Sequence, residues 1–337
     1  MVLLLPVGGN ENAILYHTAE FTSRLLIARC SVVAADRVAL HLVGMVDRPT
    51  AVLDFYDRHP INEAQILATL RRRGKDPAAL VPEDLYDLDQ DHYGGLAAVE
   101  ALARRAEITG KTSVLDICAG LGGPARFLTH RFGCHVTGID LNRGRCDAGR
   151  RLSRLVGLGR RVTMVNGDAQ ALPFRTGAFM AVVSQEGLLH VPDKAAVLGE
   201  CARVLAPGGR IAFSDWIATS RLQDGERRRL SEWMAATTLQ GISDYQAHLA
   251  RAGFIGILAE DLSTEWIVIL RERVRMYRSL REDTVARLGQ ERYDEYNQLY
   301  AFFVGLVEAG RLGGARFSGT AYPGISSPPA SRARGSR

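Results

Sequence analysis

The sequence predicts an α/β fold built around a mostly parallel sheet, and three observations support this prediction. From Thr112 onward, short apolar runs of strand length alternate with amphipathic runs of helix length. The first predicted strand leads into a glycine-rich turn at 119–123, and a helical segment follows directly. A second turn, Pro207-Gly208-Gly209, joins a helix to a later strand. Because short connections between alternating strands and helices require right-handed crossovers, the strands are expected to lie parallel.

The predicted elements follow each other in order along this part of the chain. Strands are expected at residues 113–118, 134–139, 161–166, 178–184, 210–215, 254–262 and 315–322. Helices between them are expected at residues 123–132, 142–157, 193–205, 226–240 and 244–251. Two more helices, at 265–288 and 291–309, each carry an apolar stripe at helical spacing, so we interpret 265–310 as a helical insertion before the last strand.

The part of the chain before this domain is expected to be helical. Residues 45–110 contain predicted helices at 50–56, 62–73, 82–88 and 95–106. A polar loop at 89–95 precedes the first strand, where such loops commonly cover a ligand. Residues 111–322 then form the main domain.

The two ends of the sequence differ from the rest in composition. In residues 1–44 charged side chains interrupt the apolar ones, so neither a membrane span nor a secretory signal is predicted. We interpret this segment as an over-extended start ahead of Met45. Residues 323–337 are rich in Pro, Ser and Arg and are predicted to be disordered.

Charge and cysteine content narrow the class of protein. The 337-residue chain has a formal net charge of +5 at pH 7. Without the three arginines of the C-terminal tail this value is about +2, so no nucleic-acid-binding face is required. The five cysteines are scattered and include no CxxC pair, which indicates reduced thiols in a cytoplasmic protein and no metal site.

Three carboxylates at predicted strand ends are the strongest chemical signal. Asp116 stands four residues before Gly120, where it would repel a pyrophosphate but suits a ligand with a cationic amino-acid end. Asp140 ends the second strand 20 residues after Gly120, at a position where a carboxylate can accept hydrogen bonds from the two hydroxyls of a ribose. Asp168 follows the third strand and could accept from an adenine amino group.

Four motifs in order resemble those of class I S-adenosylmethionine-dependent methyltransferases, and the resemblance covers about residues 85–322. The motifs are Asp116…Gly120-x-Gly122, Asp140, Asp168 and Leu205-x-Pro207-Gly208-Gly209. The resemblance implies a Rossmann-like, seven-stranded sheet with an antiparallel last strand, and S-adenosylmethionine as cofactor. It implies that the cofactor is bound by these residues: Tyr93, Gly94, Asp116, Gly120, Gly122, Asp140, Leu141, Asp168, Ala169 and Gln185. Cys118-Ala119 departs from the family, which often has a Gly-Cys or Gly-Ser pair there, and should stiffen the turn without removing the site.

Two further segments are similar to enzymes that methylate small molecules. These are Leu88-Asp89-Gln90-x-His92-x-Gly94-Gly95 and Gly310-x-Leu312-Gly313-Gly314, which resemble sarcosine/dimethylglycine N-methyltransferases and, more distantly, phosphoethanolamine methyltransferases. In the latter an acid and a histidine four residues apart follow the fourth strand, as Glu186 and His190 do here. The resemblance implies a catalytic His190 that meets a tyrosine from the N-terminal loop, for which Tyr93 is the first candidate and Tyr86 the second.

Each of these assignments has a plainer alternative. His190 could cap the helix that follows it, Glu186 could serve only to solvate its loop, and His92 could be structural. As substrate-binding residues we expect Glu186, His92 and Gln90. The stripe of Tyr293, Tyr296, Tyr300 and Phe303 could enclose a methylated ammonium through cation–π contacts, but a helical aromatic stripe usually belongs to a core.

Four functions therefore compete. The favoured one is methyl transfer to a small acceptor, most readily an amine nitrogen of the glycine, sarcosine or dimethylglycine kind, by an enzyme that could form a homo-oligomer. The second is O- or C-methylation of a phenolic or isoprenoid natural product, and the third is a non-catalytic protein that only binds S-adenosylmethionine. The fourth, a nucleic-acid methyltransferase, is disfavoured because Ser184-Gln185-Glu186-Gly187 replaces the Asn/Asp-Pro-Pro-Tyr/Phe and Pro-Cys motifs of those enzymes.

Overall fold

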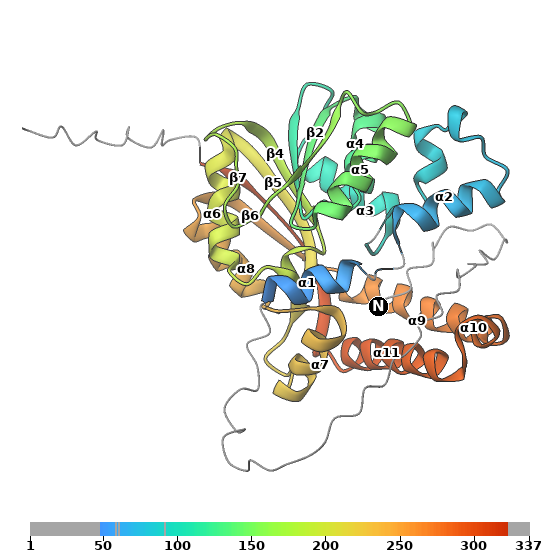
Figure 1. Ribbon diagram of the computed structural model, residues 1–337. Coiled ribbons are helices and arrows are strands. Elements are labelled where there is room, and N and C mark those ends of the chain that lie inside the picture. Colours follow the sequence, from blue (N-terminus) through green and yellow to red (C-terminus); the bar gives the residue numbers. More distant parts are fainter. Residues whose placement is uncertain (1–47, 58, 60, 91, 323–337) are drawn as a thin grey trace, which may run out of the picture.

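The computed structural model describes residues 48–57, 59, 61–90 and 92–322, and its centre is one seven-stranded mixed sheet (Figure 1). The strands lie in the order β3-β2-β1-β4-β5-β7-β6. The pairs β3–β2, β2–β1, β1–β4 and β4–β5 are parallel, whereas β7 runs antiparallel to both of its neighbours. The predicted fold class, with an antiparallel last strand, is confirmed.

The strands lie close to their predicted positions. Their bounds are β1 Ser113–Ile117, β2 His135–Asp140, β3 Val162–Asn166, β4 Phe179–Gln185, β5 Leu205–Ala218, β6 Phe254–Asp261 and β7 Leu312–Ala321. β5 is longer than predicted at both ends. Its N-terminal extension contains the Pro207-Gly208-Gly209 turn, and its C-terminal one pairs with β7 as far as Ala218 opposite Leu312.

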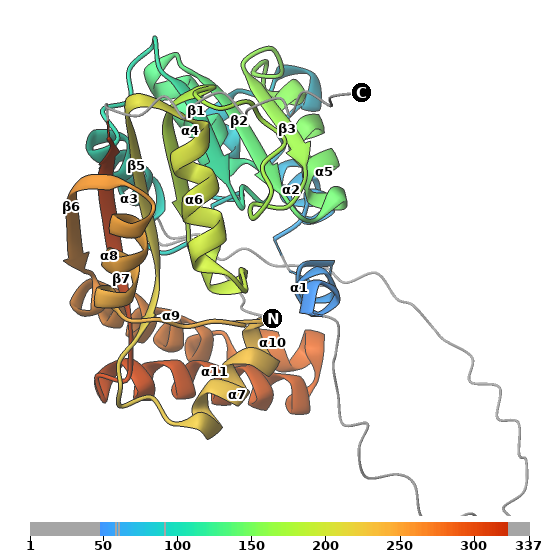
Figure 2. The ribbon, with the colours of Figure 1, turned by 90° about the vertical axis from the view of Figure 1, so that its left-hand side faces the viewer.

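Helices cover both faces of the sheet. Their bounds are α1 Arg48–Asp57, α2 Glu63–Arg72, α3 Gly95–Arg105, α4 Gly123–Phe132, α5 Arg143–Leu155, α6 Lys194–Val204, α7 Asp224–Met234, α8 Ile242–Arg251, α9 Ser263–Ser279, α10 Arg281–Leu288 and α11 Gln290–Glu308, with short 3₁₀ turns η1 Pro77–Ala79, η2 Pro82–Leu85 and η3 Leu188–His190. On β1, Val114 packs with α3, α4 and α5, whereas Leu115 packs with α6 and α8. This alternation follows from the period of two in a strand, and Figure 2 shows α6 in front of the sheet.

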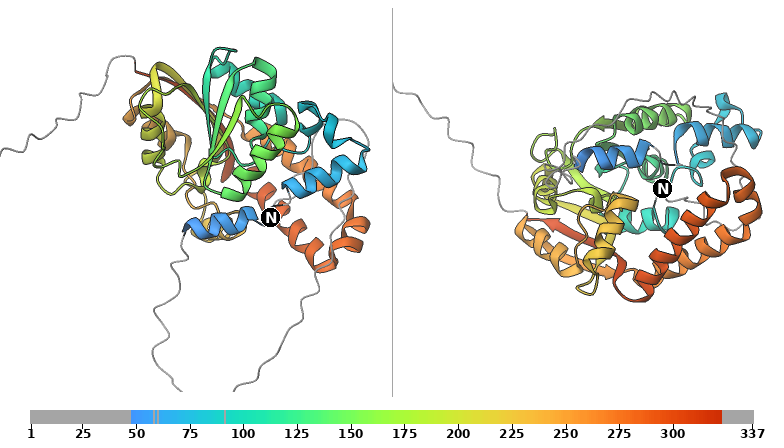
Figure 3. Two further views of the ribbon diagram at one scale, coloured as in Figure 1. Left: turned by 45° about the horizontal axis from the view of Figure 1, so that its top comes forward. Right: turned by 60° about the horizontal axis from the view of Figure 1, so that its bottom comes forward.

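A helical layer covers one end of the sheet. The predicted insertion contains three helices instead of two, because the chain breaks at Leu280 and again at Gly289, which has a φ of 85°. Helices α9 and α11 pack with α7 and the end of β5 around a separate apolar core (Figures 1 and 3). Both predicted stripes, including Trp266, Leu270, Tyr300 and Phe303, are buried there.

Helix α1 lies at the same end of the sheet as this layer, below the carboxyl ends of the parallel strands (Figures 1 and 2). The helices predicted within 45–110 occur near the expected positions, with 82–88 reduced to the turn η2. The segments 1–44 and 323–337 lie outside the described residues. Among the residues that the structure describes, no helix is both long enough and apolar enough to cross a membrane.

Candidate active site

The turn after β1 has a backbone shape that L-residues rarely adopt. Cys118, Gly120 and Gly122 all have positive φ angles, of 56°, 54° and 75°. At Gly120 and Gly122 the absence of a Cβ makes this conformation inexpensive, but Cys118 carries strain. Gly187, after β4, lies directly against Cys118, since a Cβ built on Gly187 would come within 2.3 Å of the Cys118 Cβ. The departure from the family pattern is thus accommodated by a glycine on the neighbouring loop, and the turn remains open to a ligand.

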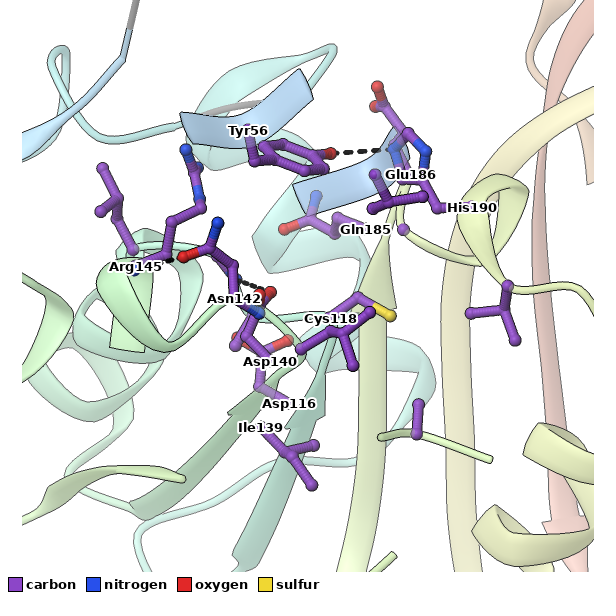
Figure 4. Close-up of a pocket in the computed structure, with 18 of the residues that line it drawn as sticks. Tyr56, Asp116, Cys118, Ile139, Asp140, Asn142, Arg145, Gln185, Glu186 and His190 are labelled. Carbon is purple, nitrogen blue, oxygen red and sulfur yellow. Dashed lines mark hydrogen bonds between the residues drawn. The ribbon is translucent and has the colours of Figure 1, made fainter. Parts of the chain in front are cut away.

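Asp140 connects this turn to the end of β2. Its Oδ2 accepts a hydrogen bond from the backbone N–H of Gly120 at 2.7 Å, and its Oδ1 accepts one from the N–H of Asn142 at 2.9 Å (Figure 4). The side chain of Asn142 in turn caps α5, because its Oδ1 accepts from the N–H of Arg145. The carboxylate is therefore fixed by two backbone donors at the edge of the cavity.

Asp116 is a buried carboxyl without compensation. Its side chain is 2% exposed, and its Oδ2 has no hydrogen-bond partner in the part of the chain that the structure describes. Burial, and then the negative charge of Asp140, raise the pKa of Asp116 to about 8 from an ordinary value of 3.8. The Oε1 of Gln185, at the end of β4, is also buried there without a partner. Such a pair of acceptors suits a ligand that brings N–H donors or a positive charge.

These groups surround a cavity of about 150 Å³ at the carboxyl end of the sheet. Ten of the residues predicted as site residues line it: His92, Asp116, Gly120, Asp140, Leu141, Asp168, Ala169, Gln185, Glu186 and His190. Asp168 is exposed, and its Oδ1 accepts from the N–H of Gln170 at 2.8 Å. The strand ends thus come together as the sequence predicts.

Helix α1 closes the cavity on the side away from the sheet. Its residues Val52, Leu53 and Tyr56 line the wall, and its last residue, Asp57, accepts a hydrogen bond from the Nδ2 of Asn142 at 2.7 Å. The Arg145 guanidinium lies 4.8 Å from the centroid of the Tyr56 ring and donates to the carbonyl of Ile61 at 3.2 Å. Two residues of the α5 N-terminus therefore hold α1 over the cavity.

His190 is held in one tautomer by the hydrogen bonds of its two ring nitrogens. The Nδ1 is 2.9 Å from the carbonyl oxygen of Ala235, which can only accept, so Nδ1 carries the proton. In the neutral ring Nε2 then accepts from the hydroxyl of Tyr56 at 2.9 Å. Figure 4 shows this Tyr56–His190 contact spanning the cavity from α1 to η3. His190 does not act as a helix cap; that position is taken by Asp193, whose side chain accepts from the N–H of Ala196.

The tyrosine that contacts His190 was predicted wrongly. Tyr93 points its ring at Trp216 and Trp266 in the core below the cavity, and Tyr86 bonds to His130 on the surface. Tyr93 was the candidate because the resemblance implies a tyrosine from the N-terminal loop, but helix α1 places Tyr56 against His190. The aromatic pair Phe55-Tyr56 at the end of a predicted helix was the available signal.

A second, smaller cavity of about 50 Å³ adjoins the first. Its wall is mostly apolar and aromatic and consists of Phe55, Tyr56, His59, Tyr93, Glu186, Leu189, His190, Trp216, Met234 and Phe303. Three of these residues, Tyr56, Glu186 and His190, line the larger cavity as well. A ligand in either space therefore touches the same polar groups.

Glu186 stands at this junction in a strained conformation. Its φ is 52°, its backbone N–H donates to the carbonyl of Ser214 at 2.8 Å, and its Oε1 accepts from the N–H of Tyr93 at 2.7 Å. A non-glycine residue with positive φ that is held by two such bonds is typical of functional sites. Glu186 is also 9% exposed, so it does more than solvate a loop.

The loop at 89–95 is held against the glycine turn by a chain of polar contacts. Asp89 and Arg126, each about 1% exposed, form an ion pair of 2.7 Å, and Gln90 donates to Asp89 at 2.7 Å. The Oε1 of Gln90 is 2.9 Å from the Nε2 of His92, whose Nδ1 is 3.2 Å from the Nε2 of Gln185. The chain thus runs from α4 to the end of β4.

Three predicted site residues line neither of these two cavities. Gln90 uses its amide to connect Asp89 with His92. Gly94 is the N-cap residue of α3 with a φ of 80°, and Gly122 is the N-cap residue of α4 and lies against Met164. Each shapes the wall from behind instead of contacting the space. Direct contact of these three residues with a ligand therefore stays a prediction.

The aromatic stripe on α11 is chiefly core, as its plainer interpretation holds. Tyr293 stacks on Tyr277 of α9 with ring centroids 5.1 Å apart, and Tyr300 is 2% exposed. Phe303 alone among the four residues of the stripe lines the smaller cavity.

Lys194, at the start of α6, holds the segment that carries His190. Its ammonium is 2% exposed and donates to the carbonyls of Leu188, Val191 and Thr238. Burial lowers the pKa of Lys194 to about 8. The bonds join both ends of η3 to Thr238 in the loop between α7 and α8, the loop that also contains Ala235, so they hold the two sides of the His190 ring together.

Known proteins with similar sequences are methyltransferases. Residues 114–209 match the family model of a methyltransferase domain. The chain is 32% identical over 195 residues to a glycine/sarcosine/dimethylglycine N-methyltransferase from Actinopolyspora halophila, a match over 58% of this chain and 34% of the relative. Across three curated relatives the chain covers 34%, 66% and 35% of their own lengths.

Solved structures share the fold. A phosphoethanolamine N-methyltransferase 2 from Haemonchus contortus, in complex with phosphomonomethylethanolamine and S-adenosylhomocysteine, superposes with a TM-score of 0.66 at 21% identity, over 80% of this chain and 60% of that one. A geranyl diphosphate C-methyltransferase from Streptomyces coelicolor gives 0.62 at 16% identity, over 82% and 99%. The sheet order and the family match agree: the chain has the fold of class I S-adenosylmethionine-dependent methyltransferases, and its residues 114–209 match the methyltransferase domain family.

Proposed function

We propose that the protein transfers a methyl group from S-adenosylmethionine to the nitrogen of a small amine. The observation that carries this proposal is the position of the Tyr56–His190 pair and of Glu186, which form the shared wall of a larger and a smaller cavity. A cofactor in the larger space and an acceptor in the smaller one would meet at these three side chains.

The larger cavity fits S-adenosylmethionine by the chemistry of its donors and acceptors. The Oδ2 of Asp116 and the Oε1 of Gln185, which have no partner among the described residues, suit the ammonium of the amino-acid end, and Gly120 lines the same cavity without a side chain. Asp140 would accept from the ribose hydroxyls, and Asp168 with Ala169 would border the adenine beside Leu141. When bound, the cofactor supplies an electrophilic methyl group on a sulfonium.

The smaller cavity fits a compact amine. Its aromatic rings, including Phe55, Trp216 and Phe303, can stabilise a methylated ammonium, and the Glu186 carboxylate adds a negative charge at its mouth. Its volume of about 50 Å³ excludes a bulky acceptor without movement of the wall. Small size, aromatic walls and one carboxylate are therefore the features that favour an amine.

The residues of the site would contribute mainly alignment and proton removal. The apolar wall excludes water from the in-line path between the two cavities. The Tyr56 hydroxyl can accept a proton from a primary or secondary ammonium while it passes its own to the Nε2 of His190, and the Ala235 carbonyl stabilises the imidazolium through Nδ1–H. A tertiary amine would need no base, only the aromatic wall and Glu186.

One observation favours a second candidate, C-methylation or O-methylation of an apolar natural product. Most of the smaller cavity's wall is hydrocarbon, which suits an isoprenoid or phenolic group as well as it suits a methylated ammonium.

The test is transfer of labelled methyl from S-adenosylmethionine to glycine, sarcosine, dimethylglycine, phosphoethanolamine and a set of phenols. Labelled amines support the proposal; labelled phenols with silent amines would overturn the acceptor class. Cofactor binding without any turnover would favour the non-catalytic alternative.

Two variants test the residue roles in the same assay. His190→Ala and Tyr56→Phe should lower kcat for a secondary amine by roughly 10²–10³-fold with little change in cofactor affinity. Tyr86→Phe is the matched control, because Tyr86 lies on the surface against His130. Unchanged kcat in His190→Ala would refute its role as a base.

A small-molecule acceptor is the expected partner, and we retain the homo-oligomer as a prediction. The four cysteines in the described part of the chain are all free thiols, which supports the proposed location in the reducing cytoplasm.

A further inference from the structure

Arg273, on helix α9, is a buried guanidinium with no counter-ion among the residues that the structure describes. The residue is 5% exposed, and its Nε and Nη1 are buried without a hydrogen-bond partner among the described residues. Its guanidinium lies over the ring of Tyr93, with its central carbon 4.2 Å from the ring centroid. Stacking uses the flat face of the group and leaves its in-plane N–H donors available.

Two more deeply buried cations, Arg126 and Lys194, show how the fold compensates such a charge elsewhere. Arg126, 1% exposed, pairs with Asp89 and donates to Leu121, Gly149 and Ser153. Lys194 donates to several carbonyl oxygens. A single cation–π contact offsets only part of the cost of removing a guanidinium from water. Arg273 therefore lacks the hydrogen-bond acceptors that the fold supplies to Arg126 and Lys194.

The location of Arg273 connects it with the smaller cavity. Tyr93, whose ring it covers, lines that cavity, and the backbone N–H of Tyr93 holds the Glu186 carboxylate at 2.7 Å. Tyr300 of α11 is near as well, because the Arg273 charge opposes the rise that burial causes in the Tyr300 pKa. The guanidinium thus sits behind the wall that faces Glu186 and His190.

We propose that Arg273 binds the anionic end of the acceptor, a carboxylate or a phosphate, while the acceptor's amine lies between Glu186 and His190. The inference rests on the proposed function and narrows its substrate class to zwitterionic amines. Two N–H donors of one guanidinium match two oxygens of either anion, so the ligand supplies the counter-charge that the chain withholds. Glu186 at one end and Arg273 at the other fix the acceptor's orientation by opposite charges.

Thermal unfolding tests the anion site without any turnover. The variant is Arg273→Met, and the matched control is Arg271→Met on the same helix, where Arg271 is half exposed and pairs with Glu308. Sodium phosphate or sodium acetate, compared with sodium chloride at equal ionic strength, should raise the Tm of the wild type and of Arg271→Met but not of Arg273→Met. Without added anion, Arg273→Met should unfold at the same or a higher temperature than the wild type, because it removes an uncompensated charge.

These two readouts separate a ligand-binding role from a structural one. A lower Tm of Arg273→Met in chloride, with anion stabilisation equal to that of the wild type, would mean that Arg273 serves only to pack against Tyr93, and would overturn the proposal. Anion stabilisation that is lost equally in Arg271→Met would also overturn it, since the effect would then come from general surface charge.

Acceptor binding by calorimetry, with S-adenosylhomocysteine present, identifies the anion. Dimethylglycine and phosphoethanolamine are compared with dimethylethylamine and ethanolamine, which lack the anionic group. Arg273→Met should weaken binding of at least one compound with an anionic group tenfold or more and leave binding of its counterpart without that group unchanged, and which compound responds distinguishes carboxylate from phosphate. Equal binding of the compounds with and without the anionic group by the wild type would refute the inference. Should anions stabilise the wild type while no amine is methylated, the proposed function fails and the anion site stands.

Discussion

Asp116 offers the sharpest test of the cofactor site, because its pKa lies far from the ordinary range. A carboxyl with a pKa of about 8 is about nine-tenths protonated at pH 7 and about one-quarter protonated at pH 8.5. A ligand ammonium next to it favours the ionised form. Binding of S-adenosylhomocysteine, which carries this ammonium and cannot be turned over, should therefore release about 0.9 proton at pH 7 and markedly less at pH 8.5.

The raised pKa of Asp116 also makes the free energy of unfolding depend on pH. In the unfolded chain Asp116 would titrate near its ordinary 3.8, so between about pH 4 and pH 8 the native state binds one more proton than the unfolded state. The stability that this group contributes is complete below pH 4 and falls as the pH rises, by about 4 kcal/mol at pH 7, taking about 1.4 kcal/mol per pH unit. Asp116→Asn should remove this loss and unfold at a higher temperature than the wild type at pH 8.

Calorimetry in buffers of different ionisation enthalpy measures the proton release, and Asp116→Asn should abolish it while weakening the binding of S-adenosylhomocysteine at least tenfold. Asp140→Asn is the control: it should weaken binding through the ribose but keep most of the release, because Asp140 contributes only the smaller cause of the Asp116 shift. Binding enthalpies of the wild type that do not depend on the buffer would refute the assignment of Asp116 as the partner of the ligand's ammonium.

Two further predictions concern the supports of the site. Arg126→Met should lower the free energy of unfolding by about 3–5 kcal/mol, because it leaves the buried Asp89 carboxylate without its ion pair. Arg131→Met, at the exposed end of the same helix, is the control and should change this free energy by less than about 1 kcal/mol. Equal effects of the two variants in urea denaturation would contradict the prediction. Gly123→Ala should weaken cofactor binding and stability together, because its Cβ would come within 2.3 Å of the Asp89 carbonyl oxygen; Gly199→Ala, with open space around its Cβ, is the control, and a neutral Gly123→Ala would disprove the close contact.

The sequence was most informative about groups that depend on strand ends. Asp116, Asp140 and Asp168 could be placed together because the carboxyl ends of parallel strands meet at one edge of a sheet, whatever the rest of the chain does. The glycine turn and the acid–histidine spacing at Glu186 and His190 are likewise local patterns. The structure places the three aspartates, Gly120, Glu186 and His190 around one cavity.

The sequence was least informative where two distant elements meet. The contact between Tyr56 and His190 joins residues 134 positions apart, and it depends on how α1 docks on the N-terminus of α5 through Asp57, Asn142 and Arg145. No periodicity in the sequence encodes that docking, so the choice among Tyr56, Tyr86 and Tyr93 could be made only from the folded chain. The burial of Arg273 without a counter-ion was hidden for the same reason: in sequence it is one arginine among several on a helix.

The charges that the fold leaves uncompensated define the two ligands better than the shape of the cavities does. Where a buried charge has a structural purpose, as in Asp89 with Arg126, the chain supplies both signs. Asp116 and Arg273 are buried just as deeply, and each lacks a partner of opposite charge in the described structure. The two stand on opposite sides of the Tyr56–His190 pair: Asp116 lines the larger cavity, and Arg273 lies behind the wall of the smaller one. An uncompensated carboxyl on one side favours a cationic ligand group, and an uncompensated guanidinium on the other favours an anionic one. Burying these groups without partners lowers the stability of the free protein, and bound ligands would compensate them. On this argument the double variant Asp116→Asn/Arg273→Met should be the most stable form of the protein at pH 8 and the one that binds neither ligand.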